Sequence, residues 1–150
     1  MTTPIPTDRE RGSVSLAPDD QARNLIVRPA VFVHLDDSLR RLSETLAEEL
    51  IGAAVVRDTH PPALVSERDV IRAIAEGGDL DETRVRDVMT EDVLVVAPKD
   101  QVLDVAYRML DNEIRHIPVV EDDVVVGLIS GRDALRVFAD QARVKDGERS

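Results

Sequence analysis

One alternation of apolar and polar positions occurs twice along the chain, and it is clearest in the second half. An apolar run at residues 93–97 has the β-branched character of a strand. Apolar residues then recur every three or four positions over 102–110, which predicts a helix with one buried face. Asp100 has the side chain of an N-cap for this helix. The segment therefore reads as a strand followed by a helix.

Two shorter apolar runs follow, at residues 117–120 and 124–129, with a short acidic stretch between them. This pattern predicts two strands joined by a tight turn. Ser130 is suited to open a last helix, in which we expect Leu135 and Phe138 to face inward. The second half of the chain is thus predicted to be strand, helix, strand, strand, helix.

The first half repeats this plan at an offset of 64 residues. Without any gap, 13 of 42 positions are identical between residues 31–72 and 95–136, against roughly three expected from ordinary composition. The apolar stripe of the first helix is formed by leucines, namely Leu39, Leu42, Leu46 and Leu50. The hairpin turn of this copy is longer and contains two prolines. An internal repeat of this kind indicates two similar structural units.

We therefore predict an α/β fold of two tandem βαββα repeats. Each repeat has too little core to be comfortable alone, so we expect the two to pack about a pseudo-two-fold axis. The predicted parts are a flexible N-terminal arm (1–23), repeat one (24–84), repeat two (85–140) and a charged C-terminal tail (141–150). The groove between two such repeats is a natural place for a ligand.

Composition excludes several classes of function. The chain has 150 residues, a net charge of −11 and no cysteine, which removes disulfides and Cys-ligated metal sites. A negative field disfavours binding of nucleic acid. No signal peptide or apolar run long enough for a membrane span is evident, so we expect a cytoplasmic protein. The three histidines are scattered, and no metal site is expected.

A resemblance to a known family rests on three segments. The sequence IRHIPVVEDDVVVGLISGRD at residues 114–133 closely resembles the second half of a cystathionine-β-synthase-type (CBS) domain. The motif VMT at 88–90 resembles the lead-in to such a domain, and ALVSERD at 63–69 is the weaker match in repeat one. The likeness covers roughly residues 24–139. It implies a pair of CBS domains, called a Bateman module, which commonly binds AMP, ADP, ATP or related adenosyl compounds.

The candidate ligand residues lie at two strand-to-helix turns. A Ser-x-x-Asp pattern is usually just a cap for a helix start, but it recurs here at equal offset in both repeats. The resemblance implies that the Asp binds ribose hydroxyls and that the Ser binds ribose or phosphate. The neighbouring arginines could converge on a phosphate. The residues concerned are Ser66, Arg68 and Asp69 in repeat one and Ser130, Arg132 and Asp133 in repeat two.

The two sites are not expected to be equal. Arg115 and His116 precede the second strand of repeat two, where relatives that bind AMP or ATP often carry phosphate-holding basic residues. At the offset of 64, Ile51 and Gly52 stand in these places. Repeat one also lacks its own Met-Thr lead-in, because Leu25 and Ile26 occupy those positions. The site that uses Asp133 is therefore expected to be the stronger.

The sequence thus predicts a non-catalytic sensor for an adenine nucleotide, with no required cofactor and Mg²⁺ only as a companion of ATP. The alternative is a structural scaffold for protein–protein interaction whose nucleotide sites are empty. The resemblance also implies a homodimer, and the signal of a stand-alone sensor requires a further protein target or the dimer itself. No enzyme motif, nucleic-acid surface or membrane segment is predicted.

Overall fold

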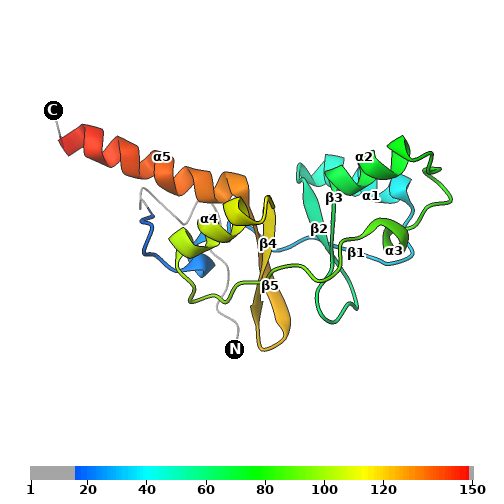
Figure 1. Ribbon diagram of the computed structural model, residues 1–150, viewed down its shortest axis with the longest axis horizontal. Helices are drawn as coiled ribbons and strands as arrows, with labels where there is room; N and C mark the ends of the chain where they lie inside the picture. The colour runs from blue at the N-terminus through cyan, green and yellow to red at the C-terminus, as the bar shows by residue number, and fades with distance from the viewer. Residues whose placement is uncertain (1–15, 149–150) are drawn as a thin grey trace. The chain divides into compact units, whose positions relative to one another are not determined.

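The computed structural model describes residues 16–148, which form two compact units (Figure 1). The contiguous unit is Ala30–Val93, and the described part of the split unit comprises residues 16–29 and 94–148. Each unit combines helices with a small sheet, so the predicted α/β class with two repeated parts is confirmed. Residues 1–15 of the predicted arm and the last two residues of the predicted tail lie outside the described residues.

The contiguous unit contains a three-stranded sheet in the order β1-β2-β3. Its elements are β1 (Phe32–Val33), α1 (Leu39–Glu49), β2 (Ala53–Val56), β3 (Leu64–Ser66), α2 (Glu67–Ala75) and α3 (Val85–Val88). Strand β2 pairs in parallel with β1 and antiparallel with β3. Buried leucines of α1 pack with alanines and valines of β2, β3 and α2, which makes the aliphatic core that the composition predicts.

The split unit is organised around the antiparallel hairpin β4–β5. Its elements are η1 (Ala22–Leu25), α4 (Val102–Asp111), β4 (His116–Glu121), β5 (Val124–Ser130) and α5 (Gly131–Glu148). Asp122 and Asp123 form the turn and both have positive φ, as a two-residue turn that follows the twist of a hairpin requires. The strand predicted at 93–97 is reduced to one parallel bridge, between Val96 and Val119.

Three details of the predicted helices are wrong. Leu50 does not belong to the buried stripe of α1, because it is the C-cap residue and is 88% exposed. Asp100 does not cap α4, because the N-cap residue is Gln101. The Asp100 carboxylate instead accepts a hydrogen bond from the Ala97 N–H at 2.8 Å and closes the preceding turn. Leu135 and Phe138 do not face inward: they are 66% and 38% exposed. The buried stripe of α5 runs one position earlier, through Ala134 and Val137.

The tail predicted from residue 141 continues as helix, since α5 runs to Glu148. At the other end, residues 16–23 were assigned to a loose arm but are bound to the split unit. Ala22 is fully buried, and its N–H donates to the Asp100 carbonyl at 2.7 Å. The Gln141 amide also donates to the Leu16 carbonyl. Figure 1 shows this segment, in blue, beside α4.

The segments that precede each repeat are exchanged between the units. Residues 18–27 precede the body of repeat one along the chain but belong to the split unit, whereas residues 80–90 precede the body of repeat two but belong to the contiguous unit. The predicted boundaries 24–84 and 85–140 describe repeats in the sequence and stay a prediction. The compact units are cut at Pro29 and Val93 instead.

Hydrogen bonding also refines the alignment of the two repeats. Ser66 pairs with Ala53, and Ser130 pairs with His116. The two serines are 64 residues apart, whereas their partners are 63 apart. The split unit therefore has one more residue within its hairpin, and the gapless comparison at offset 64 is displaced by one position in the first half of each repeat.

Gly127 in β5 is required for close packing against the N-terminal segment. A Cβ atom at this position would lie 2.5, 2.7 and 3.0 Å from three side-chain atoms of Ile26. We expect Gly127→Ala to lower the free energy of unfolding by about 1–3 kcal/mol, the usual cost of overpacking a core. Urea denaturation followed by circular dichroism measures this.

Gly131→Ala is the matched control, because the atom nearest to a Cβ added at this position is the Arg115 carbonyl oxygen, 3.8 Å away. Residue 131 opens α5, where alanine is well tolerated. Equal stability of the two variants would contradict the packing argument.

Candidate functional site

Most of the candidate residues of repeat two meet at one end of the β4–β5 hairpin. Ser130 is the last residue of β5 and lies opposite His116, the first residue of β4. The Gly131 N–H at the start of α5 donates to the Arg115 carbonyl at 2.7 Å. The strand pairing therefore brings the backbone of two basic residues beside the Ser130 turn.

Asp133 and Ser130 form a reciprocal cap at the start of α5. The Ser130 N–H and hydroxyl donate to Oδ2 of Asp133 at 2.8 and 2.9 Å, and the Asp133 N–H donates back to the Ser130 Oγ at 3.2 Å. All of these bonds to the carboxylate use Oδ2. In the part of the chain that the structure describes, Oδ1 of Asp133 accepts no hydrogen bond, and the residue is half-buried. One carboxylate oxygen is thus available to a ligand.

The equivalent carboxylate in the contiguous unit is more fully engaged. Ser66 donates to Oδ2 of Asp69 through its N–H and hydroxyl, at 2.9 and 3.2 Å. The Thr90 hydroxyl lies 3.4 and 3.5 Å from the two carboxylate oxygens, and Arg72 lies 3.5 Å from Oδ1. Asp69 is only 5% exposed. Both of its oxygens are therefore occupied by neighbours within the unit.

Sequence reasoning missed Thr90 as a neighbour of Asp69. It assigned the motif at 88–90 to the second repeat, but the Thr90 N–H donates to the Leu64 carbonyl at 2.7 Å, and the Thr90 carbonyl accepts from the Leu64 N–H at 3.1 Å. The lead-in that repeat one seemed to lack is therefore supplied by the chain after α3. In the split unit, the offset of 63 places Val27 at the corresponding position, so this unit has no hydroxyl there.

The register also changes which residues correspond to Arg115 and His116. The Glu67 N–H donates to the Gly52 carbonyl at 2.9 Å, as Gly131 does to Arg115. The counterparts in the contiguous unit are therefore Gly52 and Ala53, one position later than the sequence comparison indicated. The chemical contrast is unchanged, because these residues carry no charge.

Arg68 and Arg132 lie at the two turns and are exposed. Neither makes an ion pair within residues 16–148. They belong to different units, so their convergence on one phosphate stays a prediction. The same described range holds no group of three or more His, Asp or Glu residues placed to bind a metal ion. Nor does it contain a helix long and apolar enough to cross a bilayer.

The different surroundings of the two carboxylates predict different effects on stability. Asp133→Ala removes a helix cap and should cost about 1 kcal/mol of unfolding free energy. Asp69→Ala also leaves Thr90 and Arg72 without their partner, so we expect it to cost about 1 kcal/mol more. Urea titrations of both variants test this, with Glu67→Ala as a control for an exposed acid in the same turn. An equal or larger loss for Asp133→Ala would refute it.

Comparison with known proteins gives the family. The CBS domain family model matches residues 22–76 and 85–140. A mitochondrial CBS domain-containing protein of Arabidopsis thaliana is 34% identical over 115 residues, which are 72% of this chain and 56% of that protein. An uncharacterized protein of Methanocaldococcus jannaschii is 37% identical over 94 residues, 62% of this chain and 33% of its own length. The chain thus spans about half or less of these relatives.

Solved structures agree with this assignment. A CBS-domain containing protein from Agrobacterium tumefaciens has a TM-score of 0.72 at 27% identity, over 79% of this chain and 98% of its own. The CBS domain pair of protein MJ0100, in complex with 5′-methylthioadenosine and S-adenosyl-L-methionine, has a TM-score of 0.71 at 23% identity, over 79% and 98%. A hexameric CBS-CP12 protein from bloom-forming cyanobacteria has a TM-score of 0.72 at 26% identity, over 83% and 72%. The chain belongs to the CBS domain family and contains two CBS domains.

Proposed function

We propose that this protein is a non-catalytic regulatory module that binds an adenine nucleotide, AMP, ADP or ATP, at the Ser130–Asp133 turn of the split unit. The observation that carries the proposal is the open Oδ1 of Asp133 at a turn where Ser130 pairs with His116 and the Gly131 N–H donates to the Arg115 carbonyl. A carboxylate with one open oxygen can accept hydrogen bonds from a ribose diol. Arg115 can then donate to phosphate, since guanidinium and phosphate match in geometry and charge.

The choice of an adenine ligand is supported by a relative. The CBS domain pair of protein MJ0100 binds two adenosine-containing compounds. The α5 N-terminus adds to the case for a phosphate, because the first N–H groups of a helix favour an anion. No cofactor is part of this proposal, and Mg²⁺ enters only if the ligand is ATP. An acidic chain without cysteine is consistent with the cytoplasm as its location.

The rival function is a scaffold whose nucleotide sites are empty. Asp69 favours this reading for the contiguous unit, because both of its oxygens already have partners. The two hypotheses therefore differ mainly in what happens at Asp133. We expect one tight binding event rather than two equal ones.

Isothermal titration calorimetry with AMP, ADP and ATP tests the proposal. Asp133→Ala should abolish the tight event, whereas Asp133→Asn keeps a cap acceptor and separates binding from folding. Arg115→Ala should weaken binding roughly ten- to a hundredfold, since a hydrogen bond to a charged group contributes about 1.5–3 kcal/mol. Asp69→Ala should leave the event mostly intact. Circular dichroism checks that each variant is folded.

Arg136→Ala is the matched control, because this exposed arginine lies on α5 one helical turn after Arg132 and so further from the Ser130–Asp133 turn. It should bind as the original protein does. No heat with any adenine nucleotide at millimolar concentration would favour the scaffold. Tighter binding of GTP would reject adenine as the base, and loss of binding in Asp69→Ala alone would show that the wrong carboxylate was chosen.

A homodimer is also part of the proposal, and exposed apolar helix surfaces support it. In the split unit α4 packs against α5, and each carries large apolar residues that are exposed, namely Tyr107, Leu110, Leu135 and Phe138. The pair α1 and α2 of the contiguous unit exposes Leu50, Ile71 and Ile74. Such patches mark interaction surfaces. A second copy of the chain is the occupant we favour over an unidentified protein target.

Native mass spectrometry should therefore give the mass of a dimer, and any retained nucleotide would appear in the same spectrum. Leu135→Glu should shift the protein towards the monomer, because it introduces a charge into the apolar surface. Val124→Glu is the control: Val124 is 60% exposed but lies in the hairpin rather than on a helix. A monomer for the unaltered protein at micromolar concentration would reject the dimer.

A further inference from the structure

Both units expose large apolar residues at equivalent places on the helix that follows their hairpin. In α2 these residues are Ile71 and Ile74, which are 65% and 51% exposed. Their counterparts in α5, 64 residues later, are Leu135 and Phe138, which are 66% and 38% exposed. The exposure is therefore a repeated feature of the fold, and clusters of this kind mark interaction surfaces.

Exposed arginines lie beside these apolar residues in both helices. Arg68 and Arg72 belong to α2, and Arg132 and Arg136 stand at the same places in α5. Arg72 lies 3.5 Å from Asp69, whereas the other three make no ion pair within residues 16–148. The outer faces of α2 and α5 therefore share one order of apolar and basic side chains.

The neighbouring helices α1 and α4 are equivalent as well, but their exposed residues differ. Their buried residues are displaced by 63 positions, namely Leu39, Leu42 and Leu46 in α1 and Val102, Val105 and Met109 in α4. At the same offset, Glu44 of α1 corresponds to Tyr107 of α4. Ala47 corresponds to Leu110 in the same way, and all four residues are exposed. The α4 face is therefore bulky and apolar where the α1 face is acidic or small.

At a third position the difference is reversed. Leu50, the C-cap residue of α1, is 88% exposed and has φ 56, whereas its counterpart after α4 is Glu113 with φ 53. The left-handed conformation is unfavourable for a residue other than glycine, and an exposed leucine gains nothing from burial. Leu50 thus contributes little to its own unit and adds an apolar side chain to the surface of α1 and α2.

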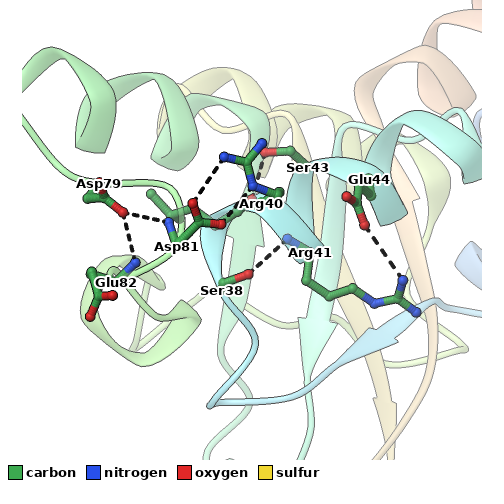
Figure 2. A network of polar contacts seen from close by, with 9 residues as sticks. Ser38, Arg40, Arg41, Ser43, Glu44, Asp79, Asp81 and Glu82 are labelled. Atoms are coloured by element: carbon green, nitrogen blue, oxygen red, sulfur yellow. Dashed lines mark hydrogen bonds and ion pairs between the residues drawn. The ribbon is translucent and has the colours of Figure 1, made fainter.

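Glu44 is only weakly held within its own helix (Figure 2). Its carboxylate lies 3.7 Å from Arg41, three residues earlier, and both side chains are more than half exposed. An ion pair of this kind contributes little. The Glu44 carboxylate is therefore accessible to a hydroxyl donor from another molecule.

A dimer can bring these surfaces together in two ways. We call the exposed residues of α1 and α2 the contiguous surface and those of α4 and α5 the split surface. If like surfaces pair, two contiguous surfaces place two Glu44 carboxylates and two small Ala47 side chains in one contact, which gives repulsion and little apolar area.

If unlike surfaces pair, the exposed residues complement one another. Leu110 of one copy then shares a contact with Ala47 of the other, so a large side chain is combined with a small one. Tyr107 shares the same contact with Glu44, and its hydroxyl can donate to that carboxylate. The common pattern of α2 and α5 lets either helix serve on either side.

We propose that two copies of this chain pair through unlike surfaces, with the contiguous surface of each copy against the split surface of the other. In a two-fold dimer this contact forms twice. The inference rests on the homodimer of the proposed function, because it states which surfaces that dimer uses together. It does not depend on a bound nucleotide.

Mixing two damaged copies tests the pairing. Ile71→Glu puts a charge in the contiguous surface and Leu135→Glu puts one in the split surface, at equivalent positions of nearly equal exposure. With unlike pairing, each variant alone has one charge in both contacts of its dimer, so the Kd should rise about tenfold or more. The mixture can form a heterodimer in which one contact holds both charges and the other is undamaged. Native mass spectrometry, with one variant isotopically labelled, should therefore show this heterodimer above its share in random pairing.

Like pairing predicts the reverse. Each variant alone would then keep one undamaged contact and the heterodimer would keep none, so a heterodimer at or below its random share would overturn the unlike pairing. Single variants that dimerise as tightly as the unaltered protein would overturn the use of these helix surfaces. The chain with both substitutions is the control and should form no dimer with either single variant, and circular dichroism checks that all variants are folded.

The same spectra separate this inference from the proposed function. A monomer for the unaltered protein would reject the homodimer and the unlike pairing with it. A dimer of the unaltered protein without heterodimer enrichment would reject the unlike pairing alone. The samples contain no nucleotide, so neither result changes the proposed binding at Asp133.

Discussion

Each unit of this protein completes its hydrophobic core with a short segment that lies outside its βαββα body. In the split unit, α4 and the β4–β5 hairpin leave an apolar surface that Ala22, Leu25 and Ile26 cover. In the contiguous unit, Val85 and its neighbours cover the corresponding surface of α1 and the sheet. A βαββα unit of this size buries too little surface without the addition. This requirement determines where the chain must cross between units and which residues reach each candidate site.

The pattern of the sequence predicted the elements well because the signals are local. Strands, helices and the tight turn of the hairpin follow from apolar runs and acidic turn residues a few positions apart. The errors arose where equal signals compete. In α5, Leu135 and Phe138 are more apolar than Ala134, so sequence alone favours burying them, whereas the structure buries Ala134 and Val137. One extra residue within the β4–β5 hairpin displaced the gapless alignment by one position.

The candidate site was predictable to the extent that its residues are neighbours in the chain or across one hairpin. Ser130 and Asp133 are three residues apart, and strand pairing brings His116 opposite Ser130. Thr90 lies 21 residues after Asp69, and it reaches that residue only because the chain returns past β3 after α3. No spacing rule reveals such a return. The consequence for chemistry is a further inequality between the two sites: one carboxylate is enclosed by its own unit and the other retains an open oxygen.

The exchange of lead-in segments means that the unit of sequence repetition and the unit of packing are out of phase. Along the sequence, a lead-in segment (residues 18–27 or 80–90) stands before the βαββα body of each repeat. In the structure, each body is completed by the lead-in segment of the other repeat. The first lead-in therefore packs with the body of the second repeat. Cutting the gene at the junction between repeats separates every body from the segment that completes it. A permuted gene that moved residues 16–29 to follow α5 would instead place each body and its segment in one continuous stretch.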